Sequence, residues 1–312
     1  MSRPVTIVMY HYVRELAHSR FPAIKGLSLE RFRRQLDHIQ ANYTPVAVED
    51  LIAALGPGGR DLPPRALLLT FDDGYTDHYV NVLPALLARG IRGCFFPPAQ
   101  AVLEHVVLDV NKIHFILASA GDPGRLLAEV VALMEDFRAD YDLAPARRYL
   151  QTAPADHRFD PREVVVIKRL LQRELPPPVR NEIVRRLFAE HVTTDETAFA
   201  RELYMSADQL AGLRRAGMHV GSHGFSHAWL DRLDPAGQAA EIDRSLAFLD
   251  ALGASRDSWT ICYPYGGYNA SLLDLLRARR CRLGFGVTPR VADLDADEPL
   301  ALPRVDTNDL PS

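Results

Sequence analysis

The chain has 312 residues, of which 47% are hydrophobic and 24% are charged, and its formal net charge is -4 at pH 7. This composition is ordinary for a globular protein with one large core or two modest ones, and it excludes a largely disordered chain. Because binding to nucleic-acid phosphates needs clustered positive charge, the negative balance argues against a nucleic-acid-binding protein. No segment reaches the ~18 consecutive apolar residues of a membrane-spanning helix.

The first predicted element is a strand over residues 5–10, and the segment before it lacks the features of a signal peptide. His11 follows this strand directly, so its side chain could face a site at the strand end. Apolar residues at helical spacing predict an amphipathic helix over 28–43, with Ser28 as its N-cap. A short strand and a helix are predicted within 46–55. We expect these helices to pack on the outside of a sheet.

The apolar run 66–70 predicts a buried parallel strand, and it is followed by Asp72, Asp73 and Gly74. In enzymes of alternating strands and helices, functional groups gather at the C-terminal ends of such strands. Two neighbouring carboxylates point in different directions, so one could bind a metal while the other acts as a base. The alternative is a strand that ends in a simple Asp-Gly turn, and partner residues elsewhere in the chain decide between the two.

A helix over 80–87 and a strand over 91–96 continue the alternation of strands and helices. From about residue 101 to 201 apolar residues recur at helical spacing, and we predict helices and no strand there. An all-helical stretch of this length could form a lid, a substrate collar or a dimer contact. His114 is a further candidate site residue within it.

The alternation resumes after this stretch. The predicted elements are helices over 206–216, 235–252 and 270–280 and strands over 218–221, 258–262, 283–287 and 300–305. Together with the first part of the chain they make about seven strands with intervening helices. This pattern predicts an α/β fold, a distorted (β/α) barrel. We assign residues 1–104 and 201–312 to the barrel and 105–200 to a helical insertion.

Two histidines four residues apart, His223 and His227, follow the predicted strand 218–221. The spacing alone is weak evidence, but its place after a second strand end strengthens it. Two imidazoles and one carboxylate form a common divalent-metal site that leaves positions open for water and substrate. Zinc suits such ligands best, and iron, cobalt or nickel are alternatives.

Three segments, in this order, resemble the motifs of the polysaccharide deacetylases of carbohydrate esterase family 4. They are Thr-Phe-Asp-Asp-Gly at 70–74, Ser-His-Gly-Phe-Ser-His at 222–227 and Tyr-Pro-Tyr-Gly at 263–266. The resemblance extends over the predicted barrel and supports the barrel fold. It implies the following roles: Asp72 is the catalytic base, Asp73, His223 and His227 hold the metal, and the backbone N–H of Tyr265 donates to the oxyanion.

The sequence departs from this family at two places. Where the third motif usually carries an arginine two residues before its proline, this chain has Cys262, and the histidine usual in the last motif is absent from residues 300–306. Arg304 is always charged and is a poor proton donor, but it could orient Asp72 in place of the missing arginine. His11 is our first choice for the general acid.

We therefore predict a metal-dependent hydrolase that removes an N-acyl group, acetyl or alternatively formyl, from an amino sugar of a polysaccharide or glycan precursor. The first alternative is a carbohydrate-binding protein that kept the barrel with weakened catalysis. The second is a metal amidohydrolase that acts on a non-sugar amide.

The cysteines suggest where the protein acts. Cys94, Cys262 and Cys281 fall within or beside predicted core segments, and buried thiols are typical of a reducing cytoplasm. We expect a cytoplasmic enzyme with a carbohydrate substrate that could be carrier-linked. The basic clusters at 31–34 and 277–282 are expected to form solvated helix faces, with peripheral contact to anionic lipid as an alternative. A homodimer through the helical insertion is a further expectation.

Overall fold

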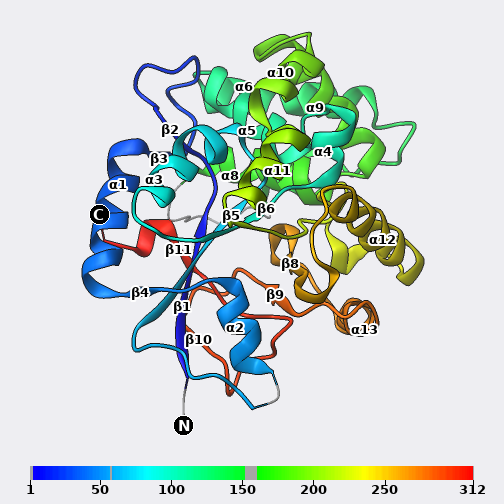
Figure 1. Ribbon diagram of the computed structural model, residues 1–312. Helices are drawn as coiled ribbons and strands as arrows, with labels where there is room; N and C mark the ends of the chain where they lie inside the picture. The colour runs from blue at the N-terminus through cyan, green and yellow to red at the C-terminus, as the bar shows by residue number, and fades with distance from the viewer. Residues whose placement is uncertain (1–2, 57, 152–159, 312) are drawn as a thin grey trace. The chain divides into compact units, whose positions relative to one another are not determined.

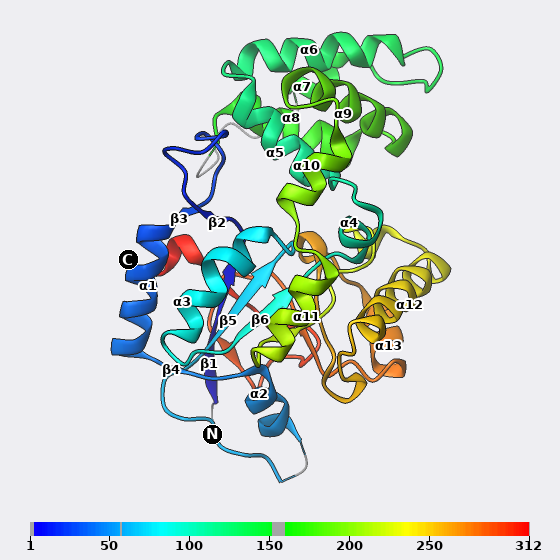
Figure 2. The ribbon, with the colours of Figure 1, turned by 45° about the horizontal axis from the view of Figure 1, so that its top comes forward.

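The computed structural model describes residues 3–56, 58–151 and 160–311 (Figures 1 and 2). Its contacts divide the chain into two compact units. The first, called the barrel unit here, holds Met1–Glu15, Gly26–Val106 and Ala200–Ser312, and the second, the helical unit, holds Leu16–Lys25 and Val107–Phe199. Among the described residues, no helix is both long and apolar enough to span a membrane.

Parallel strands form one half of the barrel. They are β1 (Pro4–Tyr10), β5 (Ala66–Asp72), β6 (Gly93–Phe96) and β7 (His219–Val220), and each pairs in parallel with the next. Figure 1 shows β1, in dark blue, beside β5. Parallel strands covered by helices are buried on both faces, and all seven residues of β5 are buried, in keeping with its continuous apolar run.

The second half closes the barrel. Ser222 forms a parallel bridge to Ile261 of β8 (Thr260–Cys262), and β8 pairs with β9 (Leu283–Phe285). Phe285 bridges Leu302, and β11 (Val305–Asp306) pairs in parallel with β1. Over the described part of the chain this makes a closed series of seven parallel strands, some joined by single bridges. The predicted distorted (β/α) barrel is confirmed.

Along β5 the side chains alternate between two cores. Leu67 and Phe71 pack in the cluster that includes residues of the outer helices, whereas Leu68 packs with residues of the barrel interior. Because successive side chains of a strand point to opposite faces, Thr70 and Asp72 follow Leu68 onto the inner face. The first carboxylate therefore enters the barrel at the C-terminal end of its strand.

The remaining elements of the barrel unit cover or extend the strands. The helices are α1 (Leu29–Asn42), α2 (Val48–Leu55), α3 (Leu83–Leu87), α4 (Ala99–Glu104), α11 (Ala207–Arg215), α12 (Pro235–Ala251) and α13 (Ala270–Ala278). The short strands are β2 (Val13–Arg14), β3 (Leu27–Ser28), β4 (Thr44–Pro45) and β10 (Ala292–Asp293). Both ribbon views show α12 and α13 side by side (Figures 1 and 2). The predicted N-cap Ser28 accepts a hydrogen bond from the backbone N–H of Arg31 at 3.3 Å.

Most predicted boundaries agree with the structure to within about two residues, and three elements differ in other ways. The helix expected over 80–87 begins earlier, as a π-helical turn, η1 (His78–Val82), that leads into α3. The strand expected within 46–55 is instead β4, because the backbone N–H of Ala47 donates to the Asp50 carboxylate at 2.8 Å and starts α2 there. The expected strand 300–305 is reduced to one bridge at Leu302 and β11, since Pro303, which lacks an N–H, lies between them.

The helical unit contains no strand among its described residues, as predicted. Its helices are α5 (Asp109–Ser119), α6 (Pro123–Asp136), α7 (Ala146–Gln151), α8 (Arg162–Arg169), the π-helical turn η2 (Leu170–Glu174) and α9 (Pro177–His191), and α10 (Glu196–Leu203) leads out of it. Leu16–Lys25, which lies within the range predicted for the barrel, groups with this unit because Phe21 packs edge-on against Phe115 and Phe199 at 4.9 and 5.8 Å. The boundaries of the insertion as a domain stay a prediction.

Candidate active site

The carboxylate of Asp72 is held inside the barrel by Arg304. The guanidinium Nη1 and Nη2 atoms donate to Oδ1 and Oδ2 at 2.9 and 2.8 Å, a bidentate pair. Arg304 is anchored in turn, because Nη1 also donates to Thr70 Oγ1 at 3.0 Å and Nε to the carbonyl of Gly286 at 2.8 Å. The side chains of Asp72 and Arg304 are only 2% and 1% exposed. Thus Arg304 lies where an arginine could replace the one absent at Cys262.

Two other groups approach the same carboxylate. The Cys262 thiol donates to Asp72 Oδ2 at 3.3 Å, and His11 Nε2 lies 3.9 Å from that oxygen. Burial by itself raises a carboxyl pKa, but the charge of Arg304 and its hydrogen bonds outweigh burial and lower the pKa of Asp72 to about 2. Asp72 is therefore an anion at neutral pH.

Asp73 meets the two histidines of the second motif. Its Oδ1 atom lies 3.3 Å from His223 Nε2 and 3.4 Å from His227 Nε2, and all three residues are buried. His223 Nδ1 lies 2.8 Å from the carbonyl oxygen of Cys262, which can accept but not donate, so Nδ1 carries the proton. In the neutral ring Nε2 then presents a lone pair toward Asp73.

This arrangement fits a divalent cation. Asp73 Oδ1 is buried and has no hydrogen-bond partner, and the three ligand atoms lie within 4.8 Å of one another. An acceptor oxygen that faces imidazole lone pairs is unfavourable unless a cation or an added proton lies between them. Ligand atoms of Asp72, His223 and Cys262 also lie within 4.8 Å of one another, but the Asp72 carboxylate is already bound by Arg304. The donor set built on Asp73 is therefore the better fit.

The backbone is strained at three of the predicted site residues. Asp73, His227 and Tyr265 have φ angles of 69°, 60° and 57°, in the left-handed region that residues with a Cβ seldom adopt. Such conformations cost of order 1–3 kcal/mol each and cluster at functional sites. Gly74, at φ 66°, continues the turn after Asp73, and a Cβ there would lie 2.7 Å from Pro97 Cβ.

Glu241 on α12 holds the loop that carries both histidines. Its Oε2 atom accepts hydrogen bonds from the backbone N–H groups of Phe225 and Ser226, both at 3.0 Å, and its Oε1 accepts from the Ser226 hydroxyl at 2.7 Å. Sequence reasoning missed Glu241, and it also missed Tyr75, whose hydroxyl donates to Asp73 Oδ2. An Asp–x–Tyr spacing beside a metal motif is the one signal that could have pointed to Tyr75.

Tyr265 and His11 border this cluster. The Tyr265 ring stacks on Trp229 at 4.3 Å with an interplanar angle of 4° and meets the His227 ring edge-on at 4.8 Å. His11 is partly exposed, with 43% of its side chain accessible. Its carbonyl oxygen lies 2.9 Å from Nε2 of His78, which anchors the backbone there.

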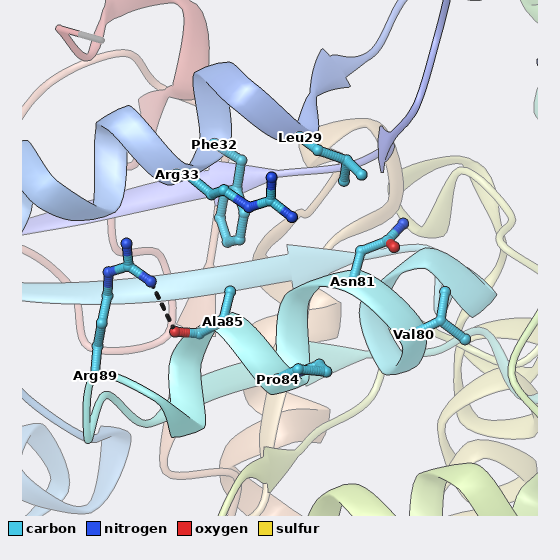
Figure 3. A pocket seen from close by; sticks show the side chains of 8 residues that line it. All are labelled: Leu29, Phe32, Arg33, Val80, Asn81, Pro84, Ala85 and Arg89. Carbon is cyan, nitrogen blue, oxygen red and sulfur yellow. Dashed lines mark hydrogen bonds between the residues drawn. The ribbon is translucent and has the colours of Figure 1, made fainter. Parts of the chain in front are cut away.

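A pocket of the barrel unit lies apart from these residues. It has a volume of about 290 Å³ and lies between α1 and the η1–α3 segment, with Arg33 and Phe32 opposite Val80 and Pro84 (Figure 3). None of the predicted site residues lines it. His114 lies on α5 of the helical unit, and a role for it stays a prediction.

The fold and this cluster are typical of a (β/α)-barrel enzyme that carries carboxylates and imidazoles at the ends of its strands. The sequence model of the polysaccharide deacetylase family matches residues 59–135 and 182–283, more than half of the chain. The chain therefore belongs to the polysaccharide deacetylase family. This confirms the family and the class of enzyme that the three motifs predicted.

Individual proteins resemble this chain in part of its sequence or in its fold. A segment of 85 residues, 27% of the chain, is 36% identical to the poly-beta-1,6-N-acetyl-D-glucosamine N-deacetylase of Escherichia coli (strain K12), and the match spans 12% of that protein. The fold is similar to the solved structure of the Streptococcus pyogenes deacetylase PplD in complex with acetate, with a TM-score of 0.60 and 15% identity over 98% of this chain and 93% of that one. It is also similar to IcaB from Ammonifex degensii, with a TM-score of 0.54 and 18% identity over 97% and 91%.

Proposed function

We propose that this protein is a divalent-metal-dependent hydrolase that removes an acetyl group from the nitrogen of an amino sugar in a glycan or glycan precursor. The observation that carries the proposal is the pair of neighbouring carboxylates with separate partners. Asp72 is held by Arg304, and Asp73 faces His223 and His227 with one oxygen. One carboxylate is thereby available for proton transfer and the other for metal binding.

Asp73 Oδ1, His223 Nε2 and His227 Nε2 would hold the metal. When bound, a divalent cation would polarise the acyl carbonyl and lower the pKa of a water molecule. Three protein ligands leave positions open for this chemistry, as in other catalytic sites with two histidines and a carboxylate. Zinc is the first choice, and iron, cobalt or nickel are the alternatives that the same ligands accept.

Asp72 would take the proton of the attacking water. Arg304 holds the pKa of Asp72 below its usual value, so the carboxylate is an anion at neutral pH and can accept a proton. Arg304 keeps both oxygens of Asp72 oriented, and the Cys262 thiol donates to Oδ2. Arg304 thus acts by positioning Asp72, in place of the arginine that other members of the family carry in the third motif.

Tyr265 and His11 would complete the reaction. The backbone N–H of Tyr265 would donate to the oxyanion that forms when water adds to the acyl carbon. His11 would then protonate the sugar nitrogen as the C–N bond breaks, which releases acetate and a free amine. The position of His11 Nε2, 3.9 Å from Asp72 Oδ2 and accessible to solvent, supports this role.

The nature of the substrate is also a proposal. The E. coli relative is named as a deacetylase of a polymer of N-acetyl-D-glucosamine, and PplD was solved with acetate, which supports an acetylated amino sugar over a formylated one. The buried cluster argues against a carbohydrate-binding protein without catalysis. Burying its charged side chains costs stability, and a binding protein would gain nothing from them. A non-sugar amide is the remaining alternative.

We propose a cytoplasmic location, so that the substrate would be a precursor, which could be linked to a nucleotide or a lipid carrier. The support is that Cys94, Cys262 and Cys281 are buried as free thiols, and Cys262 uses its thiol proton as a donor to Asp72. Cell fractionation tests this proposal, and an extracellular pool of the protein would contradict it. Nothing in the described residues supports the homodimer expected from the sequence.

The function is tested by measuring acetate and formate release from nucleotide-linked, lipid-linked and polymeric amino sugars and from non-sugar amides. Each substrate is assayed with a chelator, with added metal and with the Asp72→Asn variant. We expect acetate release from an amino sugar that the chelator abolishes and added metal restores. Release that survives both chelation and Asp72→Asn, or release from non-sugar amides alone, would contradict the proposal.

A further inference from the structure

Tyr75 is a buried tyrosine two residues after Asp73, and the family resemblance assigns it no role. Its hydroxyl donates a hydrogen bond to Asp73 Oδ2. A phenol keeps its proton at neutral pH, so Tyr75 acts as the donor and the carboxylate as the acceptor. The tyrosine is completely buried.

This hydrogen bond makes the two oxygens of the Asp73 carboxylate different. Oδ2 is engaged by Tyr75, whereas Oδ1 has no hydrogen-bond partner and faces Nε2 of His223 and His227 at 3.3 and 3.4 Å. Without the hydroxyl, rotation of the carboxylate would cost little and would leave its orientation open. With it, one oxygen is presented to the histidines before any cation arrives.

The position of the hydroxyl is fixed by packing. The Tyr75 ring stacks between Tyr12, at 4.0 Å and 18°, and Tyr204, at 6.2 Å and 13°. The backbone is held as well, because Tyr75 forms a bridge with Tyr204 and the N–H of Met205 donates to the carbonyl of Gly74 at 2.9 Å. A group held in this way is already oriented, so little conformational entropy is lost when a ligand binds.

We propose that Tyr75 is a positioning residue that sets the metal affinity of the site by holding Asp73 with Oδ1 toward the two histidines. The inference rests on the proposed function, since it needs Asp73 to be a metal ligand. Groups that hold metal ligands in this way raise metal affinity by about 10–100-fold in other proteins. A tyrosine that only fills the core would stabilise the fold without changing metal affinity.

The test is a competition titration of the metal-free protein with Zn²⁺ against a chromophoric chelator, with thermal unfolding measured in parallel. Tyr75→Phe keeps the stacked ring and removes the hydroxyl, and we expect about 10–100-fold weaker Zn²⁺ binding. Tyr10→Phe is the matched control. Tyr10 is also completely buried, at the end of β1, and its hydroxyl has no hydrogen-bond partner, so its removal should leave Zn²⁺ affinity unchanged.

Activity at increasing Zn²⁺ gives a second measurement, because a weakened site is refilled by excess metal whereas a misfolded one is not. We expect Tyr75→Phe to regain most of its turnover at saturating Zn²⁺. If Tyr75→Phe is too unstable to titrate, Tyr12→Leu is the second variant. It removes a residue that stacks on the Tyr75 ring but leaves the Tyr75 hydroxyl in place, so Zn²⁺ binding should weaken by a smaller factor.

The variant His227→Ala separates this inference from the proposed function. Wild-type affinity in Tyr75→Phe together with lost binding in His227→Ala would overturn the role of Tyr75 and leave the metal site standing. Wild-type affinity in both variants would overturn the metal site as well.

Discussion

Asp72 in the barrel and Glu182 on α9 of the helical unit are carboxylates held by arginines in very different surroundings. Hydrogen bonds from Arg185 and Arg186 lower the pKa of Glu182 to about 2. The pKa of Asp72 also falls to about 2, although burial opposes the effect of Arg304. The side chain of Glu182 is 29% exposed, whereas that of Asp72 is 2% exposed.

The comparison teaches that a lowered pKa alone does not identify a functional carboxylate. Glu182 and its arginines lie three and four residues apart on one helix face, and such exposed pairs contribute about 0–1 kcal/mol. Arg304 comes from the far end of the chain, and removing one partner of a buried pair costs about 3–5 kcal/mol. A buried charge pair of this kind is better explained by a role in catalysis than by a contribution to stability.

The largest expected effect tests whether the barrel cluster is a metal site at all. His227→Ala removes one of three proposed ligands, and we expect it to abolish both bound metal and deacetylation. Elemental analysis of the purified variant checks the first effect and acetate release the second. Stoichiometric metal in His227→Ala would show that the assignment of ligands is wrong.

The next effect separates the two neighbouring carboxylates. Asp72→Asn should keep the metal, because Asp73 supplies the ligand oxygen, and should lower turnover by about 10²–10⁴-fold through loss of the base. Steady-state rates and metal content measured on the same sample check this. A variant with nearly normal turnover would remove Asp72 from the mechanism.

A smaller effect concerns His78, whose ring forms a hydrogen bond with the backbone carbonyl of His11. Burial lowers the pKa of His78 from 6.5 to about 4, so the unfolded chain binds a proton at higher pH than the folded protein does. Stability from this group is therefore complete above about pH 6.5 and falls by about 3 kcal/mol as the pH drops to about 4.

His78→Gln keeps an N–H donor for the carbonyl of His11 but does not titrate. Denaturant unfolding between neutral pH and pH ~4 should thus show a smaller loss of stability in this variant than in the wild type. Equal losses in the two proteins would mean that His78 is not buried as a neutral ring.

The smallest expected effect is on the surface of the helical unit. Glu182→Gln breaks the ion pairs with Arg185 and Arg186, yet we expect it to change the free energy of unfolding by less than ~1 kcal/mol. Metal content and turnover should stay at wild-type values. A large loss of metal or turnover in Glu182→Gln would contradict the conclusion that Asp72 is functional and Glu182 is not.

Much of the fold could be predicted because hydrophobic periodicity is a local property. The strand that ends in Asp72 and Asp73 is buried on both faces and shows this as an apolar run, and the helices show one apolar face. Packing between segments far apart in sequence is not a local property. Leu16–Lys25 groups with the helical unit through Phe21, and its short sequence carries no periodic signal of this packing.

The site divides in the same way. The sequence by itself determined that carboxylates, imidazoles and a turn with Tyr265 end three strands, since each group lies in a short motif. The tertiary structure decided which of them meet. Arg304 reaches Asp72 because the barrel closes between β11 and β1, and Tyr75 reaches Asp73 Oδ2 because Tyr204, from a distant part of the chain, fixes its ring. The closure of the barrel and the packing of Tyr204 on Tyr75 join segments far apart in sequence, and periodic patterns along a single segment do not predict such contacts.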